Sequence, residues 1–151
     1  MKLSDVTEGF LRSLDIHAVL PQQEPFVMVG RLVRFALDSS TTETLVGEDC
    51  LFVKDGCFSP CGILENIAQT CAARIGFYNK YILERDVQIG YIGAVRDFTV
   101  TRVAKAGSLL TTTVDVIEEI FGMTLAEATV RCGDTVIATG RVKLATADKE
   151  M

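Results

Sequence analysis

Hydrophobic residues recur at helical spacing in the middle of the chain. From Ile63 onward the apolar positions fall at i, i+1, i+4, i+5, i+8, i+9 and i+12, which is a wide stripe at the period of an α-helix. Turn formers and Pro60 precede the stretch, and proline is favoured in the first turn of a helix. The pattern predicts a mostly buried helix from about Pro60 to Tyr81. Its stripe consists of Ile63, Leu64, Ile67, Ala68, Cys71, Ala72 and Ile75.

Two polar side chains, Glu65 and Gln69, interrupt this apolar helix one turn apart. Residues at i and i+4 lie on the same face of a helix, so the two side chains are expected to be neighbours. A carboxylate among residues that leave water is costly unless it has a partner or a function. Glu65 is therefore the first candidate for a site residue.

Before the central helix, the pattern changes from helical to extended. Ser4 to Leu14 reads as a short helix with Ser4 as its cap, and Asp15 to Leu20 as a further turn, giving a helical segment over residues 4–20. Phe26 to Leu37 is rich in β-favouring residues and predicts a strand, and Thr41 to Val46 predicts a second one.

After the central helix, the chain reads as extended segments joined by turns. Because the strands follow one another closely, an antiparallel sheet wrapped around one long helix is expected, an α+β fold in a single domain over residues 1–151. Only residues 148–151 look like a frayed tail. The predicted segments are Gln88 to Val103, Leu109 to Ile117, Leu125 to Cys132 and Val136 to Ala145, the last two forming a hairpin.

Composition narrows the class of function. The chain has 151 residues, 48% of them hydrophobic, and a formal net charge of −5. Nucleic-acid binding needs an excess of Lys and Arg that is missing here, so a small organic substrate fits better. No continuous apolar run matches a secretory signal or a membrane span, so a cytoplasmic protein without membrane attachment is expected.

Cysteine and histidine usage argues against disulfides and metals. The five cysteines are an odd set without a CxxC pair, which is typical of reduced thiols. Cys61 and Cys71 are expected to fill the core. With one histidine and no paired ligand spacing, no metal site is predicted.

Several phrases resemble the β-hydroxyacyl-acyl carrier protein dehydratase family, whose members adopt the hotdog fold. Residues 20–29, LPQQEPFVMV, resemble its LPHRYPFLLVD phrase, and residues 63–69, ILENIAQ, resemble its VEAMAQ phrase. Residues 94–98, AVRDF, and 103–108, VAKAGS, are similar to its strand ending in RF and its VxPGD turn. The matches cover the chain from about residue 16 to about residue 145. They imply a hotdog domain with Glu65 and Gln69 at the family's Glu and Gln positions.

The catalytic histidine of that family has no counterpart. Where the family has GHFPG, this chain has Gly56-Cys57-Phe58-Ser59-Pro60, and Gln22 replaces the histidine of the LPH phrase. The loop before Glu65 is also shorter. In this respect the chain resembles the divergent dehydratase-like proteins of aryl-polyene and flexirubin-type pigment pathways.

The resemblance implies a chemistry for the start of the helix. In the family, the histidine removes the α-proton of a β-hydroxyacyl thioester, amides at the helix start bind the thioester oxygen, and the helix acid assists the leaving hydroxyl. Cys61 and Gly62 would supply the amides, Phe58 would line the substrate site, and Glu65 would be the acid. Gln69 would support Glu65. The family's substrate is covalently carried on phosphopantetheine, so the resemblance implies no separate cofactor.

Alternative interpretations remain for each candidate. Glu65 could serve structure alone through a hydrogen bond to Gln69, and Gln69 could merely orient that carboxylate. Cys57 could act as a base or nucleophile, or simply fill the space left by the missing ring. His17 could replace the lost base or have a surface or packing role. Arg96 could be a solvated strand residue or part of a basic rim for a carrier protein.

The resemblance also implies partners. Hotdog domains of this family pair so that one chain gives the histidine and the other the acid, which suggests that this chain supplies Glu65 to a site completed by a histidine-bearing subunit. A homodimer or a heterodimer, with a substrate on acyl carrier protein or coenzyme A, is consistent with the sequence. The rivals are a hotdog thioesterase that uses Glu65 against the acyl carbonyl, and a non-catalytic acyl-binding or partner subunit.

Overall fold

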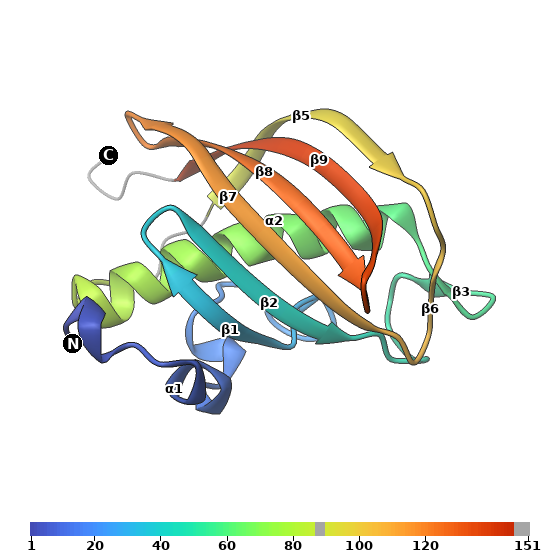
Figure 1. Cartoon of the computed structure of the whole chain (residues 1–151), viewed down its shortest axis with the longest axis horizontal. Coiled ribbons are helices and arrows are strands. Elements are labelled where there is room, and N and C mark those ends of the chain that lie inside the picture. Colours follow the sequence, from blue (N-terminus) through green and yellow to red (C-terminus); the bar gives the residue numbers. More distant parts are fainter. Residues whose placement is uncertain (87–89, 147–151) are drawn as a thin grey trace.

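One long helix runs through the centre of the structure (Figure 1). The computed structural model describes residues 1–86 and 90–146. Helix α2 spans Pro60–Phe77 and continues into a short π-helical segment, η3, at Tyr78–Ile82. Ser59 caps its start, because the Ser59 Oγ accepts a hydrogen bond from the Gly62 amide at 3.1 Å. The predicted central helix is confirmed.

A six-stranded antiparallel sheet curls around this helix in the order β1-β2-β7-β8-β9-β5 (Figure 1). The tight turn after Cys132 joins β8 to β9 in the hairpin that the alternating pattern predicted, and a second tight turn after Ile120 joins β7 to β8. The α+β architecture is therefore confirmed, and it is the hotdog fold that the resemblance implied. The strands are β1 (Arg31–Ala36), β2 (Ser39–Leu45), β5 (Gly90–Val100), β7 (Leu109–Ile120), β8 (Met123–Cys132) and β9 (Thr135–Thr146).

A small second sheet lies beside the start of α2. It has the order β3-β4-β6 and consists of Val53–Lys54, Cys57–Phe58 and Ala104–Lys105. Strand β4 ends one residue before the cap Ser59, so the sheet fixes where the helix begins. The sequence pattern did not predict these two-residue strands, which are too short to show a period.

The N-terminal region is helical, but its cap was predicted wrongly. Two 3-10 turns, η1 (Leu3–Asp5) and η2 (Ile16–Ala18), flank a six-residue helix, α1 (Glu8–Ser13). Thr7, not Ser4, caps α1, because the Thr7 Oγ1 accepts a hydrogen bond from the Phe10 amide at 3.1 Å. The backbone is extended at Val6 and Thr7, which separates the two helical pieces.

The predicted strand over Phe26 to Leu37 is only half right. Strand β1 begins at Arg31, and residues 26–29 have no strand partner. Side chains of α2 take the place of a neighbouring strand: the Met28 amide donates to the Gln69 Oε1 at 2.7 Å, and the Asn66 Nδ2 donates to the Met28 carbonyl at 2.7 Å. These bonds satisfy the buried backbone without a ladder.

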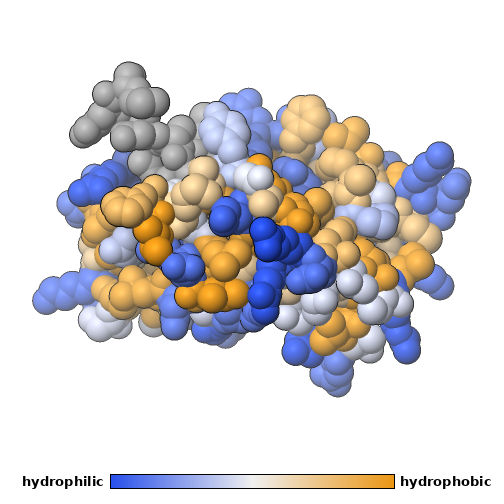
Figure 2. Space-filling model, turned by 90° about the horizontal axis from the view of Figure 1, so that it is seen from above, coloured by the Kyte–Doolittle hydropathy of each residue, from blue (hydrophilic) through white to orange (hydrophobic). Residues whose placement is uncertain are grey.

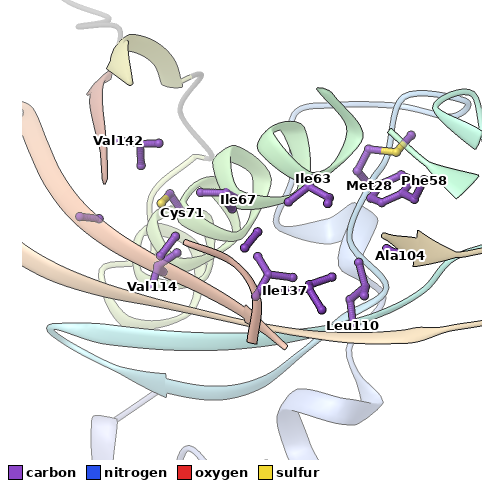
Figure 3. Close-up of a cluster of buried hydrophobic side chains, with 14 of the residues drawn as sticks. Met28, Phe58, Ile63, Ile67, Cys71, Ala104, Leu110, Val114, Ile137 and Val142 are labelled. Atoms are coloured by element: carbon purple, nitrogen blue, oxygen red, sulfur yellow. The ribbon is translucent and has the colours of Figure 1, made fainter. Parts of the chain in front are cut away.

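The main core lies between α2 and the inner face of the sheet (Figure 3). Ile63 and Ile67 of α2 are fully buried against strand residues such as Val114 and Val142. A second cluster joins the other side of the helix to the N-terminal region, where Phe77 packs with Leu11 and Val19. The helix is therefore enclosed on two sides.

Among the described residues, no helix combines the length and the apolar character needed to cross a membrane. The predicted tail at 148–151 lies outside the described residues.

Candidate active site

Glu65 lies in the second turn of α2 on the side of the helix that the sheet does not cover. Its side chain is half-buried, and it is the only acidic residue of Pro60–Phe77. Its neighbours on this stripe are apolar and also half-buried: Leu64, Ala68, Ala72 and Ile75. The apolar stripe predicted from the sequence thus divides into a buried half against the sheet and a half-exposed face that carries one carboxylate.

Gln69 holds Glu65 in place. The Gln69 side chain is fully buried, and its Nε2 donates to the Glu65 Oε1 at 2.9 Å and to the Phe26 carbonyl at 2.8 Å. Its Oε1 accepts the Met28 amide. The amide cannot flip without placing donor against donor at Met28, so the orientation of the carboxylate is set by the backbone of residues 26–28.

Asn66 continues this polar network on the sheet side. It is fully buried, and its Nδ2 donates to the Thr44 Oγ1 at 3.1 Å as well as to the Met28 carbonyl. Its Oδ1 accepts the Thr112 hydroxyl at 2.6 Å. Sequence reasoning missed Asn66, although an amide between Glu65 and the core residue Ile67 was the available signal. The network ties the Glu65 turn to strands β2 and β7.

The start of α2 offers fewer free amides than expected. Pro60 has no N–H, and the Gly62 amide is bonded to Ser59. Of the first three helical positions, only Cys61 has an amide that makes no hydrogen bond to the described residues.

The two helix cysteines differ in burial. The Cys61 side chain is exposed, so its prediction as core filler is wrong, whereas Cys71 is buried as predicted. Burial raises the pKa of the Cys71 thiol to about 12, which keeps it unreactive.

Cys57 and Phe58 occupy the short strand β4 next to the helix start. Cys57 is half-buried, and Phe58 is buried with Met28 in the main core. Phe58, Met28, Val46 and Cys50 also line a cavity of about 320 Å³ whose rim carries Glu48 and Asp49. The apolar part of this cavity can hold part of an acyl chain or a partner's side chain. Glu65 is not among its lining residues.

Arg96 belongs to a different part of the surface. It lies in β5 opposite Arg141 of β9, and both line a cavity of about 190 Å³ together with Lys143. This cavity shares no lining residue with the one beside Phe58. The structure therefore does not bring Arg96 together with the residues at the helix start.

His17 does not present a free base. Its Nδ1 is bonded to the Asp15 carboxylate, and its Nε2 lies 3.0 Å from the Glu24 Oε1. The hydrogen bonds of the ring to Asp15 and Glu24 raise the pKa of His17, and the contact with His17 lowers the pKa of Asp15. Both ring nitrogens face carboxylates on the surface, so neither is open toward a substrate.

The helix start provides an oriented carboxylate and a free amide, and a separate cavity lies beside Phe58. The carboxylate can donate a proton to a leaving group or accept one from water, and a second group is needed to remove a proton from carbon. Among the described residues, no histidine lies beside Glu65 to take this role.

One family model matches most of the chain. The model of a family described as ApeP-like, ApeP dehydratase, matches residues 14–151. No match was found among curated protein sequences.

Solved structures share the fold. A chain of the dehydratase heterocomplex ApeI:P from Xenorhabdus doucetiae superposes with a TM-score of 0.84 at 20% identity, covering 90% of this chain and 93% of that one. The uncharacterised protein PH1136 from Pyrococcus horikoshii gives 0.66 at 13% identity, covering 87% and 93%. A hypothetical thioesterase with coenzyme A from Streptococcus pneumoniae TIGR4 gives 0.62 at 7% identity, covering 80% and 87%.

Proposed function

The chain belongs to the ApeP-like dehydratase family, and from this premise we propose that it is one subunit of a dehydratase that acts on β-hydroxyacyl thioesters of an acyl carrier protein. In this proposal it supplies Glu65 to a site that a histidine of a second hotdog subunit completes. The observation that carries the proposal is the single carboxylate on the half-exposed face of α2, oriented by the buried Gln69.

The reaction divides between the two subunits. The partner's histidine removes the α-proton, the Cβ–O bond breaks, and Glu65 passes a proton to the departing hydroxyl, so that water leaves and a double bond forms. The Cys61 amide at the positive end of the helix supports the negative charge that develops on the thioester oxygen. The proton then returns from the histidine to Glu65 through solvent.

Two surfaces support the presence of a partner. The apolar stripe of α2 around Ala68 and Ala72 is half-exposed, and β5 is an eleven-residue edge strand of the main sheet. Tyr91 and Val95 of this strand are 59% and 38% exposed, and Figure 2 shows hydrophobic groups at several places on that side of the molecule. Long apolar edge strands are rarely left open in native proteins. One structural relative is a chain of a dehydratase heterocomplex, which supports the presence of a second subunit.

The test is a dehydration assay on a β-hydroxyacyl carrier protein, read as loss of water from the acyl group by mass spectrometry. The chain alone is expected to be nearly inactive, and addition of the histidine-bearing hotdog subunit from the same source is expected to restore turnover. Glu65→Gln in the complex should lower turnover by about 10²–10⁴-fold. Glu118→Gln, an exposed acid on β7, is the matched control and should have no effect. Robust turnover by this chain alone, lost on Glu65→Gln, would overturn the partner hypothesis.

A thioesterase is the second candidate, supported by a fold relative described as a thioesterase and by a helix carboxylate that needs no histidine to attack a carbonyl. Release of free thiol by the isolated protein, abolished in Glu65→Gln, would favour it. If Glu65→Gln changes neither hydrolysis nor the activity of the complex, the chain is a binding or stabilising subunit.

A further inference from the structure

Another cavity lies at the far end of α2 from Glu65, under the β7–β8 hairpin. Its volume is about 320 Å³, and its lining comes from three places: the end of α2, the β1–β2 turn at Leu37, and the hairpin residues Glu119 and Thr124. The helix contributes Arg74. Arg74 follows Glu65 by nine residues, which places it about 14 Å further along the axis and on the opposite side of the helix. The cavity is therefore separate from the proposed active site.

Arg74 is a buried cation with few partners. Its side chain is only 6% exposed. Its Nη1 donates to the Leu37 carbonyl at 2.8 Å, and its Nη2 lies 4.0 Å from the Glu119 Oε2. These are the polar contacts that the described residues give to a guanidinium with five N–H donors. A buried charge is costly unless it is paired and hydrogen-bonded, so the contacts at hand leave this one under-compensated.

Glu119 is a weak counter-ion for this arginine. Its side chain is 58% exposed, and 4.0 Å is beyond hydrogen-bonding distance. An ion pair with one solvated member contributes little. Another anion could therefore displace the Glu119 carboxylate from Arg74, and the displaced carboxylate would stay solvated.

Two more polar side chains of the lining are buried, beside the apolar side chains of Leu37 and Ile75. Thr124 and Asn79 are 3% and 8% exposed, and Tyr78 beside them is half-buried. A cavity with a buried guanidinium and two further buried polar side chains suits a hydrophilic ligand rather than an acyl chain. The flat fork of an arginine matches two oxygens of a carboxylate or a phosphate.

We propose that this cavity is a binding site for a compact oxyanion, the carboxylate or phosphate group of a small molecule, held by Arg74 with Asn79 and Thr124 at its sides and Glu119 as the counter-ion it displaces. The alternative is that Arg74 has only a structural role and connects the β1–β2 turn to α2 through its hydrogen bond to the Leu37 carbonyl. In that case the guanidinium has no affinity for added anions.

The test measures binding of sodium phosphate and of sodium acetate to the whole chain by calorimetry and by NMR shifts, with sodium chloride at equal ionic strength as the reference. The acetate and phosphate arms show which oxyanion the site prefers. Glu119→Gln removes the competing charge and should tighten binding about fivefold. Glu118→Gln makes the same charge change one residue earlier, outside this cavity's lining, and should have a smaller effect.

Arg74→Lys keeps the charge but loses the fork, and it should weaken binding by about tenfold or more. Should this variant fail to fold, the comparison of Glu119→Gln with Glu118→Gln still decides. The proposal is overturned if neither anion binds more tightly than chloride, or if Glu119→Gln and Glu118→Gln change the affinity equally.

Discussion

The Gln69 side chain donates a hydrogen bond to Glu65 at 2.9 Å while its own oxygen accepts the Met28 amide at 2.7 Å. The two contacts act together: Met28 fixes which end of the amide faces the carboxylate, and Glu65 therefore always meets a donor. One carboxylate oxygen, Oε1, is committed to this bond. In the proposed function, Oε2 is therefore the oxygen left for the substrate.

Removing the Gln69 amide should destabilise the protein and slow the complex. Gln69→Leu keeps most of the volume but leaves the buried Met28 amide and Phe26 carbonyl without their partner. The expected loss is about 3 kcal/mol in the free energy of unfolding, measured by urea denaturation. Gln23→Ala, at an exposed glutamine, should change it by less than about 0.5 kcal/mol.

The Gln69→Leu variant also distinguishes a role of Gln69 in positioning Glu65 from a role in stability alone. If Gln69 only supports the fold, turnover of the assembled complex should stay unchanged at a temperature where the variant is folded. If it positions Glu65, the maximal rate should fall while the apparent substrate affinity stays near the parent value.

Two glycines should respond in opposite directions to substitution by alanine. A Cβ at Gly76 of α2 would lie 1.9 Å from the Val19 carbonyl oxygen, whereas a Cβ at Gly9 of α1 meets nothing within 4 Å. Gly76→Ala must push the helix away from the N-terminal segment and should cost about 2 kcal/mol or more. Gly9→Ala should stabilise by up to about 1 kcal/mol through helix propensity. Equal effects in urea denaturation would show that the close approach at Val19 is easily relaxed.

Most of the regular structure could be predicted from the sequence, because its causes are local. The α2 stripe at helical period, Pro60 at the helix start, and the alternation along β7, β8 and β9 act within one element. Phe26 to Gly30 was assigned to a strand since its residues favour β structure. The backbone of Met28 and the Phe26 carbonyl instead bond to Asn66 and Gln69, about 40 positions away, and no local pattern reveals these partners.

The candidate site was predictable only in part. The i, i+4 spacing led to the contact between Glu65 and Gln69, which the structure confirms. The exposure of Cys61 was not foreseen, because the residue lies on the open face of the helix start and composition alone favours burial of cysteine. Arg74 went unnoticed, since one arginine in a helix gives no sign of whether it faces water or a cavity.

His17 should make stability depend on pH near neutrality. Asp15 and Glu24 raise its pKa in the folded protein above the ordinary value of 6.5, so their stabilising effect is complete below that value and is lost as the pH rises through the folded pKa. His17→Gln should flatten this part of the profile of urea midpoint against pH. As the chain has one histidine, the ring proton signals in NMR give the pKa directly. A titration at or below 6.5 would contradict the contacts with the two carboxylates.

The β7–β8 turn should become more stable when its aromatic residue is replaced by asparagine. Phe121 is 99% exposed and has φ of 50°, and Gly122 follows with φ of 77°. This two-residue turn with both φ positive favours Asn-Gly, and the left-handed backbone is strained for phenylalanine. Phe121→Asn should raise the free energy of unfolding by roughly 1 kcal/mol, measured by urea denaturation. Ile117→Asn, at a 49% exposed strand position of β7, is the matched control and should lower it, because asparagine is disfavoured in strands. A loss of stability in Phe121→Asn would mean that the ring makes contacts that outweigh the backbone strain.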